Sequence, residues 1–289
     1  MKRRAYRAGS FYEADERSCR RDAEHIIERA ALPADLPETL RGGLVPHAGW
    51  VFSGRTAALT LKALAERGRL DRIVLFGSDH WGVADGAAAC DRGAWETPLG
   101  DVAVDAELAS ALLEAIPALR AAPEAHAREH SIEVQLPLIE VLSPQAKIVP
   151  INVTPSPAAV QLGRDIGSLL KRDFPNASVV GSTDLTHYGP SYGFSPGGGG
   201  QAGLEWAREN DRRLLDLVQQ MAAEQVIDET AARQNACGGG AIAATIAASA
   251  ALGATRGLCL EYTTSAAVMR EVYSSRADDS VGYAAVVFA

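Results

Sequence analysis

Short apolar runs alternate along the chain with longer stretches in which apolar residues recur every three or four positions. Short runs of this kind are typical of buried strands, and the three-to-four spacing is typical of helices that bury one face. The pattern predicts strands at 44–46, 72–77, 147–153, 177–182, 257–263 and 281–288, helices at 53–68, 105–116, 131–142, 157–172, 204–223 and 239–252, and a hairpin around Thr97-Pro98-Leu99-Gly100.

The regular exchange of strand and helix indicates an α/β fold. Strands separated by helices join most simply into a parallel sheet with helices on its faces, while the hairpin is expected to add antiparallel strands. No repeat period and no linker-like change in composition interrupts the 289 residues. We therefore predict a single α/β domain over residues 1–289, with a mainly parallel central sheet flanked by helices.

Composition and charge narrow the class of partner. With 47% hydrophobic and 22% charged residues, the chain has the composition of an ordinary globular protein. Its formal net charge is −8, so the protein lacks the positive potential that attracts the phosphate backbone of a nucleic acid, and no nucleic-acid partner is expected. The longest weakly polar stretch, 241–254, is too short to cross a bilayer, and no signal-like apolar run follows the basic N-terminal residues. A cytoplasmic protein with no membrane partner is predicted.

One of the four cysteines has distinctive surroundings. Cys237 is followed by three glycines and then by an Ala-rich helical stretch, so its sulfur is expected near a helix N-terminus, where the thiolate is favoured. The alternative is a tight glycine turn beside a passively buried thiol. Cys19 and Cys90 lack such surroundings, and Cys259 is predicted to be a small core residue on a strand.

Several histidines fall where predicted strands or loops meet helices. His47 follows the strand at 44–46, His80 follows 72–77, and Asp184 and His187 follow 177–182. Open α/β sheets bind ligands beyond the carboxyl ends of their strands, so these side chains are expected at one rim. The alternative for any single histidine is a structural role in a loop. That role is assigned to the two histidines that lack such a position, His25 and His126.

Several motifs surround these residues: Arg7-Ala8-Gly9-Ser10-Phe11-Tyr12, Pro46-His47-Ala48-Gly49-Trp50-Val51-Phe52-Ser53-Gly54, Glu129-His130-Ser131-Ile132-Glu133-Val134-Gln135-Leu136-Pro137, Ser182-Thr183-Asp184-Leu185-Thr186-His187-Tyr188-Gly189 and Cys237-Gly238. Together they resemble the Memo family, also called AmmeMemoRadiSam system protein B. The motifs occur in the expected order, and the resemblance covers essentially the whole chain.

The resemblance implies a fold similar to class III extradiol ring-cleavage dioxygenases, which hold non-haem Fe(II) at one end of an α/β core. It implies that His47, His80 and Cys237 are metal ligands. It also implies that Asp184 and His187, in the family's Asp-x-x-His motif, line the metal pocket. His130 begins a predicted helix and is expected as a further pocket residue.

Two departures from the family pattern affect these expectations. The family commonly has Gly-Pro-Ser-His where this chain has Gly77-Ser78-Asp79-His80, so Asp79 adds a carboxylate that is predicted to orient an imidazole N–H. An aromatic hydroxyl often present after Pro-His-Ala-Gly is replaced by Trp50 and Phe52, so no tyrosine role is expected there.

Two imidazoles and one thiolate leave open positions on a divalent metal and suit Fe(II), copper or zinc better than magnesium or calcium. A dioxygenase also needs a base beside the metal, and His187 is the candidate because it follows a different strand from the ligands. The leading hypothesis is a metal-dependent redox protein, with iron favoured, which is either an oxidoreductase that acts with O2 on an unidentified substrate or simply a redox-active metal protein. The catalytic candidates are His187, Asp184 and His130.

Two other functions remain open at the level of sequence. Eukaryotic Memo proteins are associated with phosphotyrosine-peptide and receptor signalling, which implies a non-catalytic peptide- or ligand-binding module. The system name implies an accessory protein to a radical S-adenosylmethionine protein and an AMMECR-type protein. The chain lacks the CxxxCxxC spacing of an iron–sulfur radical enzyme, so in that case it is the companion.

Overall fold

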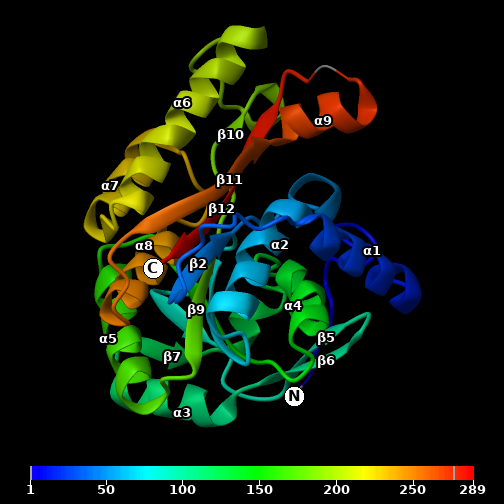
Figure 1. The fold of residues 1–289 in the computed structure, drawn as a ribbon. Helices are drawn as coiled ribbons and strands as arrows, with labels where there is room; N and C mark the ends of the chain where they lie inside the picture. The colour runs from blue at the N-terminus through cyan, green and yellow to red at the C-terminus, as the bar shows by residue number, and fades with distance from the viewer. Residues whose placement is uncertain (1, 276) are drawn as a thin grey trace.

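Parallel strands form the middle of the sheet in the computed structural model, which describes residues 2–275 and 277–289. Each of these strands is paired in parallel with its neighbours within the group, which confirms the predicted mainly parallel sheet. Figure 1 shows them crossing the centre of the molecule between two groups of helices. Their spatial order is β6 (Gly100–Val104), β8 (Lys147–Val153), β3 (Arg72–Ser78), β9 (Ala177–Ser182) and β2 (Gly42–Val45).

Antiparallel strands extend both sides of this parallel group. Beyond β2 lies β12 (Ser280–Phe288), which is antiparallel to β2, β10 (His187–Tyr188) and β11 (Gly257–Thr264). Beyond β6, the predicted hairpin is present because Thr97 pairs with Gly100. Its first strand is β5 (Ala94–Thr97), β1 (Lys2–Arg3) pairs with β5, and β4 (Ala87–Ala89) links β8 to β7 (Leu119–Ala121).

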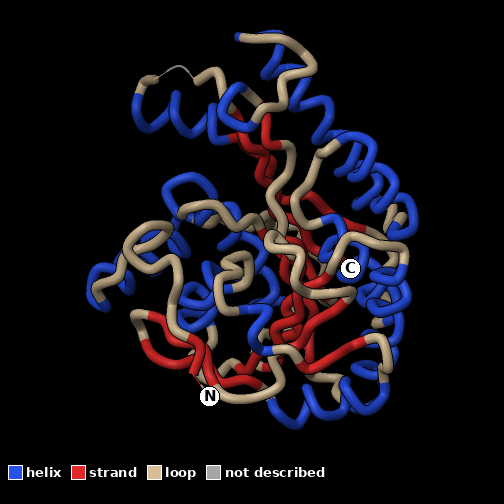
Figure 2. The backbone as a smooth tube through the Cα atoms, turned by 180° about the vertical axis from the view of Figure 1, so that it is seen from behind, coloured by secondary structure: helices blue, strands red, loops and turns tan. Residues whose placement is uncertain are grey.

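Successive side chains of the central strands enter different cores, as the pleat of a strand requires. In β3, Ile73 and Leu75 pack in one hydrophobic cluster, whereas Val74 and Phe76 pack in the other. Helices cover both faces, as Figure 2 shows from behind. One core includes side chains of α1 (Glu16–Arg29), α2 (Trp50–Arg67) and α4 (Leu136–Leu142), and the other includes α3 (Ala106–Ala115), α5 (Ala158–Asp173) and α8 (Gly239–Ala251). The result is a single α/β domain.

The closest helix pair, α5 and α8, depends on small residues. A Cβ added at Gly163 or Gly167 would collide with the backbone carbonyls of Ala244 and Ala248. The Ala-rich sequence of α8 therefore allows its backbone to approach α5 closely. This contact holds α8, whose first residues follow Cys237, against the sheet.

The largest difference from the predicted elements lies after residue 200. The helix predicted at 204–223 is α6 (Gly200–Gln219), which ends shortly before Met221, a residue in a left-handed conformation. The helix that follows, α7 (Ala223–Arg233), was not predicted. The predicted helix at 131–142 begins instead as the short helix η2 (Glu133–Gln135) before α4. Two short helices, η1 (Pro123–His126) and η3 (Pro190–Tyr192), and α9 (Ser265–Tyr273) were not predicted. No helix within the described ranges has the length and apolar character needed to cross a membrane.

The N-terminal segment is tied to the domain by one buried carboxylate. Glu133 is fully buried, and its Oε1 atom accepts hydrogen bonds from the backbone N–H groups of Tyr6 and Arg7 and from the Tyr12 hydroxyl, at 2.9, 2.7 and 2.8 Å. The guanidinium of Arg3 lies 2.8 Å from its other oxygen. Four groups of residues 3–12 thus converge on a side chain 121 or more positions away.

Candidate metal centre

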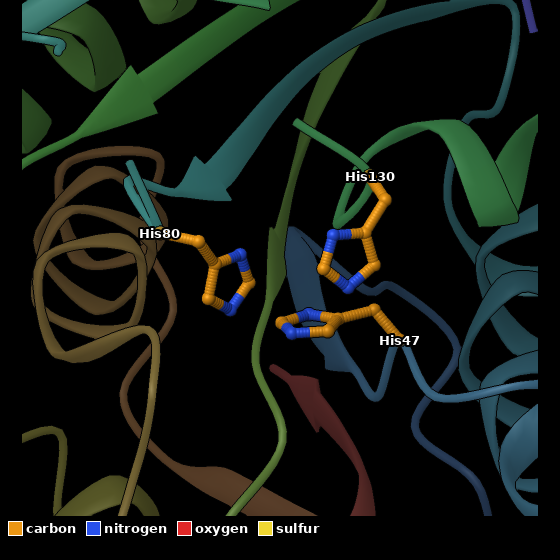
Figure 3. Close-up of side chains that lie close together, drawn as sticks. All are labelled: His47, His80 and His130. Atoms are coloured by element: carbon orange, nitrogen blue, oxygen red, sulfur yellow. The ribbon is translucent and has the colours of Figure 1, made fainter. Parts of the chain in front are cut away.

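Three histidines converge at one edge of the sheet. One ring nitrogen from each of His47, His80 and His130 lies within 4.8 Å of the other two, a spacing that can hold a metal ion. Their ring centroids are 4.8–5.4 Å apart. Figure 3 shows the rings directed toward a common space from three separate segments of the chain.

Strand register brings these segments together. Val45 pairs with Ser182, and Phe76 pairs with Gly181, so β2, β9 and β3 end at the same edge. His47 and His80 each lie two residues beyond the end of a strand, and Asp184 lies two residues beyond β9. Parallel strands that end together therefore place these three side chains at one rim, as predicted from the sequence.

Cys237 lies against this cluster. Its Sγ is 3.2 Å from Nε2 of His47 and accepts a hydrogen bond from the backbone N–H of Asp184 at 3.3 Å. The next residue must be small, because a Cβ at Gly238 would lie 2.7 Å from the Ser78 hydroxyl and 2.8 Å from the Ser182 carbonyl. The structure thus brings the predicted ligands His47, His80 and Cys237 together, and His130 lies in the same histidine cluster.

The surroundings of the Cys237 sulfur favour its thiolate form. Burial opposes its ionisation, but the positive charge of His47 and hydrogen bonds with His47 and His80 outweigh burial and hold the pKa of Cys237 well below its ordinary value. The donor set beside His47 therefore combines imidazole nitrogen with an ionised sulfur, the form that ligates metals.

A hydrogen-bond chain fixes the ring of His47. The Ser182 hydroxyl donates to the Ser131 carbonyl at 2.7 Å, so it accepts from Nδ1–H of His47 at 3.0 Å. The Asp184 carboxylate accepts from the backbone N–H of His47 at 2.7 Å. Nε2 of His47 is therefore the nitrogen that faces the centre.

A carboxylate fixes the ring of His80 in the same way. Nδ1 of His80 donates to both oxygens of Glu129, at 2.9 and 3.0 Å, which leaves Nε2 for the centre. Burial disfavours the Glu129 charge, but the hydrogen bond and charge of His80 outweigh burial and hold the pKa of Glu129 well below its ordinary range. Glu129 also accepts from the backbone N–H groups of His130 and Ser131. An ionised carboxylate behind a ligating imidazole orients the ring and raises its basicity.

The prediction for Asp79 is wrong. Its carboxylate accepts hydrogen bonds from the backbone N–H groups of Val83 and Ala84 and from the Thr154 hydroxyl. These bonds stabilise the loop after β3 and leave the carboxylate with no bond to any of the described histidines. Glu129 takes the expected place because the chain brings residues 129–131 alongside the end of β3, where Ser131 bonds to the Ser78 N–H. The motif Glu129-His130-Ser131 is the sequence signal that contains this residue.

His130 is held neutral. Burial and the positive charge of His47 lower the pKa of His130 below its ordinary value. Its ring also meets Phe11 edge-on, with centroids 5.1 Å apart. A neutral imidazole can either ligate a metal or exchange a proton, so the predicted pocket residue also belongs to the cluster that can hold the ion.

His187 lies beside the cluster on the Cys237 side. Its Nδ1 donates to the Leu185 carbonyl at 3.1 Å, so Nε2 carries the lone pair. A cavity of about 440 Å³ joins it to Cys237. None of the other lining residues was predicted from the sequence; they lie on η3, α7 and the adjoining loops and are Tyr192, Phe194, Thr230, Ala231, Gln234 and Ala236.

The two remaining histidines lie outside the centre, as predicted. His25 is exposed on α1. His126 is buried, and its Nε2–H donates to the Ala88 carbonyl at 3.0 Å. Burial lowers the pKa of His126 to about 4, which keeps the ring neutral.

Replacing Glu129 by glutamine is expected to weaken metal binding by roughly 10–100-fold, the usual loss when a partner behind a ligand is changed. The glutamine amide lacks the negative charge that orients His80. Its N–H₂ group is a donor, and it would face the N–H donors of His80, which need an acceptor. Competition with a chelator measures the affinity. Glu124→Gln, on an exposed side chain of η1, is the matched control. Equal affinities in the two variants would contradict this role for Glu129.

Fold and site together define an α/β protein with a histidine-rich centre, able to hold a metal, at the carboxyl edge of a parallel sheet. The family described as Memo-like protein matches residues 3–287. A MEMO1 family protein of Methanopyrus kandleri is 37% identical over 299 residues, spanning 100% of this chain and 99% of that protein. A MEMO1 family protein of Nitrosopumilus maritimus is 31% identical over 297 residues, spanning 100% of both chains. The chain belongs to the Memo-like family.

Proposed function

We propose that this protein binds a redox-active transition metal, with iron favoured over copper or zinc, through His47, His80 and Cys237. The observation that carries the proposal is the ionised Cys237 sulfur 3.2 Å from Nε2 of His47, beside a second imidazole whose Nδ1 is committed to Glu129. Nitrogen and thiolate donors suit these metals and not magnesium or calcium. Bound there, the metal would supply one-electron chemistry and a position for O2.

The surrounding residues suit an oxidoreductase that acts on a small molecule. The cavity of about 440 Å³ that reaches Cys237 has the size of a small-ligand pocket. His187 presents its Nε2 lone pair as a base for a substrate proton, because Nδ1–H is held by the Leu185 carbonyl. The Asp184 carboxyl positions His47 by accepting a hydrogen bond from its backbone N–H, and burial raises the pKa of this carboxyl, which lies near His187. His130, whose pKa is lowered by burial and by the positive charge of His47, presents a neutral ring nitrogen beside the metal site.

Metal reconstitution tests the proposal. Protein made without an affinity tag that binds metals is stripped, then titrated anaerobically with Fe(II), Cu(I) and Zn(II), and the bound metal is counted by mass spectrometry. We expect about one iron per chain and metal-dependent O2 uptake at an oxygen electrode. Failure to bind any of the three metals would overturn the proposal. Stoichiometric metal without O2 consumption would favour a ligand-binding protein or an accessory to a radical S-adenosylmethionine protein.

His187→Ala is expected to keep the metal and lose O2-dependent turnover. In general acid–base catalysis a positioned base contributes roughly 10²–10⁴-fold, and His187 lies in the cavity outside the three-histidine cluster. Iron content and O2 uptake are measured on the same preparations. Metal loss equal to that of His47→Ala would instead make His187 a ligand.

A further inference from the structure

An arginine without an acidic partner lies near the histidine cluster. Arg7 makes no side-chain hydrogen bond or ion pair with any residue in 2–275 or 277–289, and its Nε atom is buried without an acceptor. Its guanidinium instead stacks on two aromatic rings, 4.6 Å from the centroid of Phe11 and 5.0 Å from that of Tyr6. Stacking positions a guanidinium but leaves its N–H donors available.

Arg3, in the same N-terminal segment, differs from Arg7 because its guanidinium is paired with acceptors. Its guanidinium donates to the backbone carbonyls of His126 and Glu129 and forms an ion pair with Glu133. All of these acceptors are buried. Arg3 is therefore a structural cation, whereas Arg7 retains unused donors for a ligand.

Arg7 is held close to the metal centre by a fixed turn. Its backbone N–H donates to Glu133 at 2.7 Å, and its carbonyl accepts from the N–H groups of Ser10 and Phe11. The Phe11 carbonyl accepts from the N–H of Trp50, at the start of α2 and three residues after His47. The Phe11 ring carries Arg7 on its face and meets His130 edge-on at 5.1 Å. One ring thus separates the guanidinium from the cluster.

We infer that Arg7 binds the carboxylate of a small organic acid at the edge of the histidine cluster. A planar guanidinium matches a carboxylate through paired N–H donors, and the Tyr6 and Phe11 rings hold it in place for that contact. This inference extends the proposed function by naming the substrate class, an organic carboxylate, but its test does not need the metal.

Calorimetry with benzoate on the metal-free protein tests the inference. We expect Arg7→Gln to weaken benzoate binding by about tenfold or more, the effect of losing hydrogen bonds to a charged group. Arg4→Gln is the matched control, because it removes the same charge from an exposed side chain of the same segment. The benzoate affinity of Arg7→Lys is expected to lie between those of the wild type and Arg7→Gln, since lysine keeps the charge and loses the paired donors. Circular dichroism checks that each variant is folded.

Several outcomes would overturn the inference: no benzoate binding to the wild type, equal weakening in Arg4→Gln and Arg7→Gln, or benzamide binding as tightly as benzoate. Inorganic phosphate binding more tightly than benzoate, with the same dependence on Arg7, would replace the carboxylate by a phosphate. Benzoate binding by a protein that fails to take up iron on reconstitution would refute the proposed redox function and leave the carboxylate site standing. Normal iron uptake by a protein that does not bind benzoate would refute the carboxylate site and leave the proposed redox function standing.

Discussion

Cys237→Ser is expected to lose most of the bound iron. The change replaces an ionised sulfur 3.2 Å from the His47 Nε2 atom with a neutral hydroxyl, which is a poor ligand for a soft or borderline metal. Removing a ligand should exceed the roughly 10–100-fold loss of affinity typical of removing a partner behind one. Iron per chain after anaerobic reconstitution, and affinity by chelator competition, measure the change.

Cys259→Ser is the matched control for that experiment. Cys259 is half-buried on β11, and its thiol donates to the Glu261 carbonyl at 3.4 Å, a bond that a hydroxyl can also make. It is expected to keep its iron and to lose no more than about 1–3 kcal/mol of stability, the cost of burying an unpaired hydroxyl. If both variants retain iron, Cys237 has a structural role, and the metal is held by the histidines alone.

Glu133→Ala is expected to lower the free energy of unfolding by about 3–5 kcal/mol, the usual cost of breaking a buried ion pair. The substitution leaves the Arg3 guanidinium buried and removes the acceptor of the Tyr6 and Arg7 N–H groups. Urea denaturation followed by circular dichroism measures the change. A secondary expectation is weaker benzoate binding, because the turn that carries Arg7 loses its anchor.

Glu28→Ala controls for the loss of a carboxylate. Glu28 is exposed on α1, where exchange for alanine should alter stability by no more than about 0.5 kcal/mol. A loss below about 1 kcal/mol in Glu133→Ala would show that the N-terminal segment is held by its other contacts, such as the stacking of Arg3 on Trp95.

The sheet could be predicted because its strands obey local rules. The buried runs at 72–77, 147–153 and 177–182 are all observed as parallel strands, and the Thr97–Gly100 turn forms the expected hairpin. Helix ends were harder to predict. The helix predicted to reach residue 223 ends at Gln219 as α6, shortly before Met221, a residue other than glycine in a left-handed conformation that composition does not signal.

The position of His47, His80 and Asp184 at one rim could also be inferred from the chain, because parallel strands bring whatever follows them to a common edge, whereas only the family resemblance implied that Cys237 joins them. The partners behind these side chains could not. Asp79 adjoins His80 in sequence, yet Glu129, 49 residues away, holds the ring. The reason is physical: a carboxylate one position away bonded to its own loop, and the tertiary fold alone brought Glu129 to His80 and carried Arg7 to the edge of the cluster.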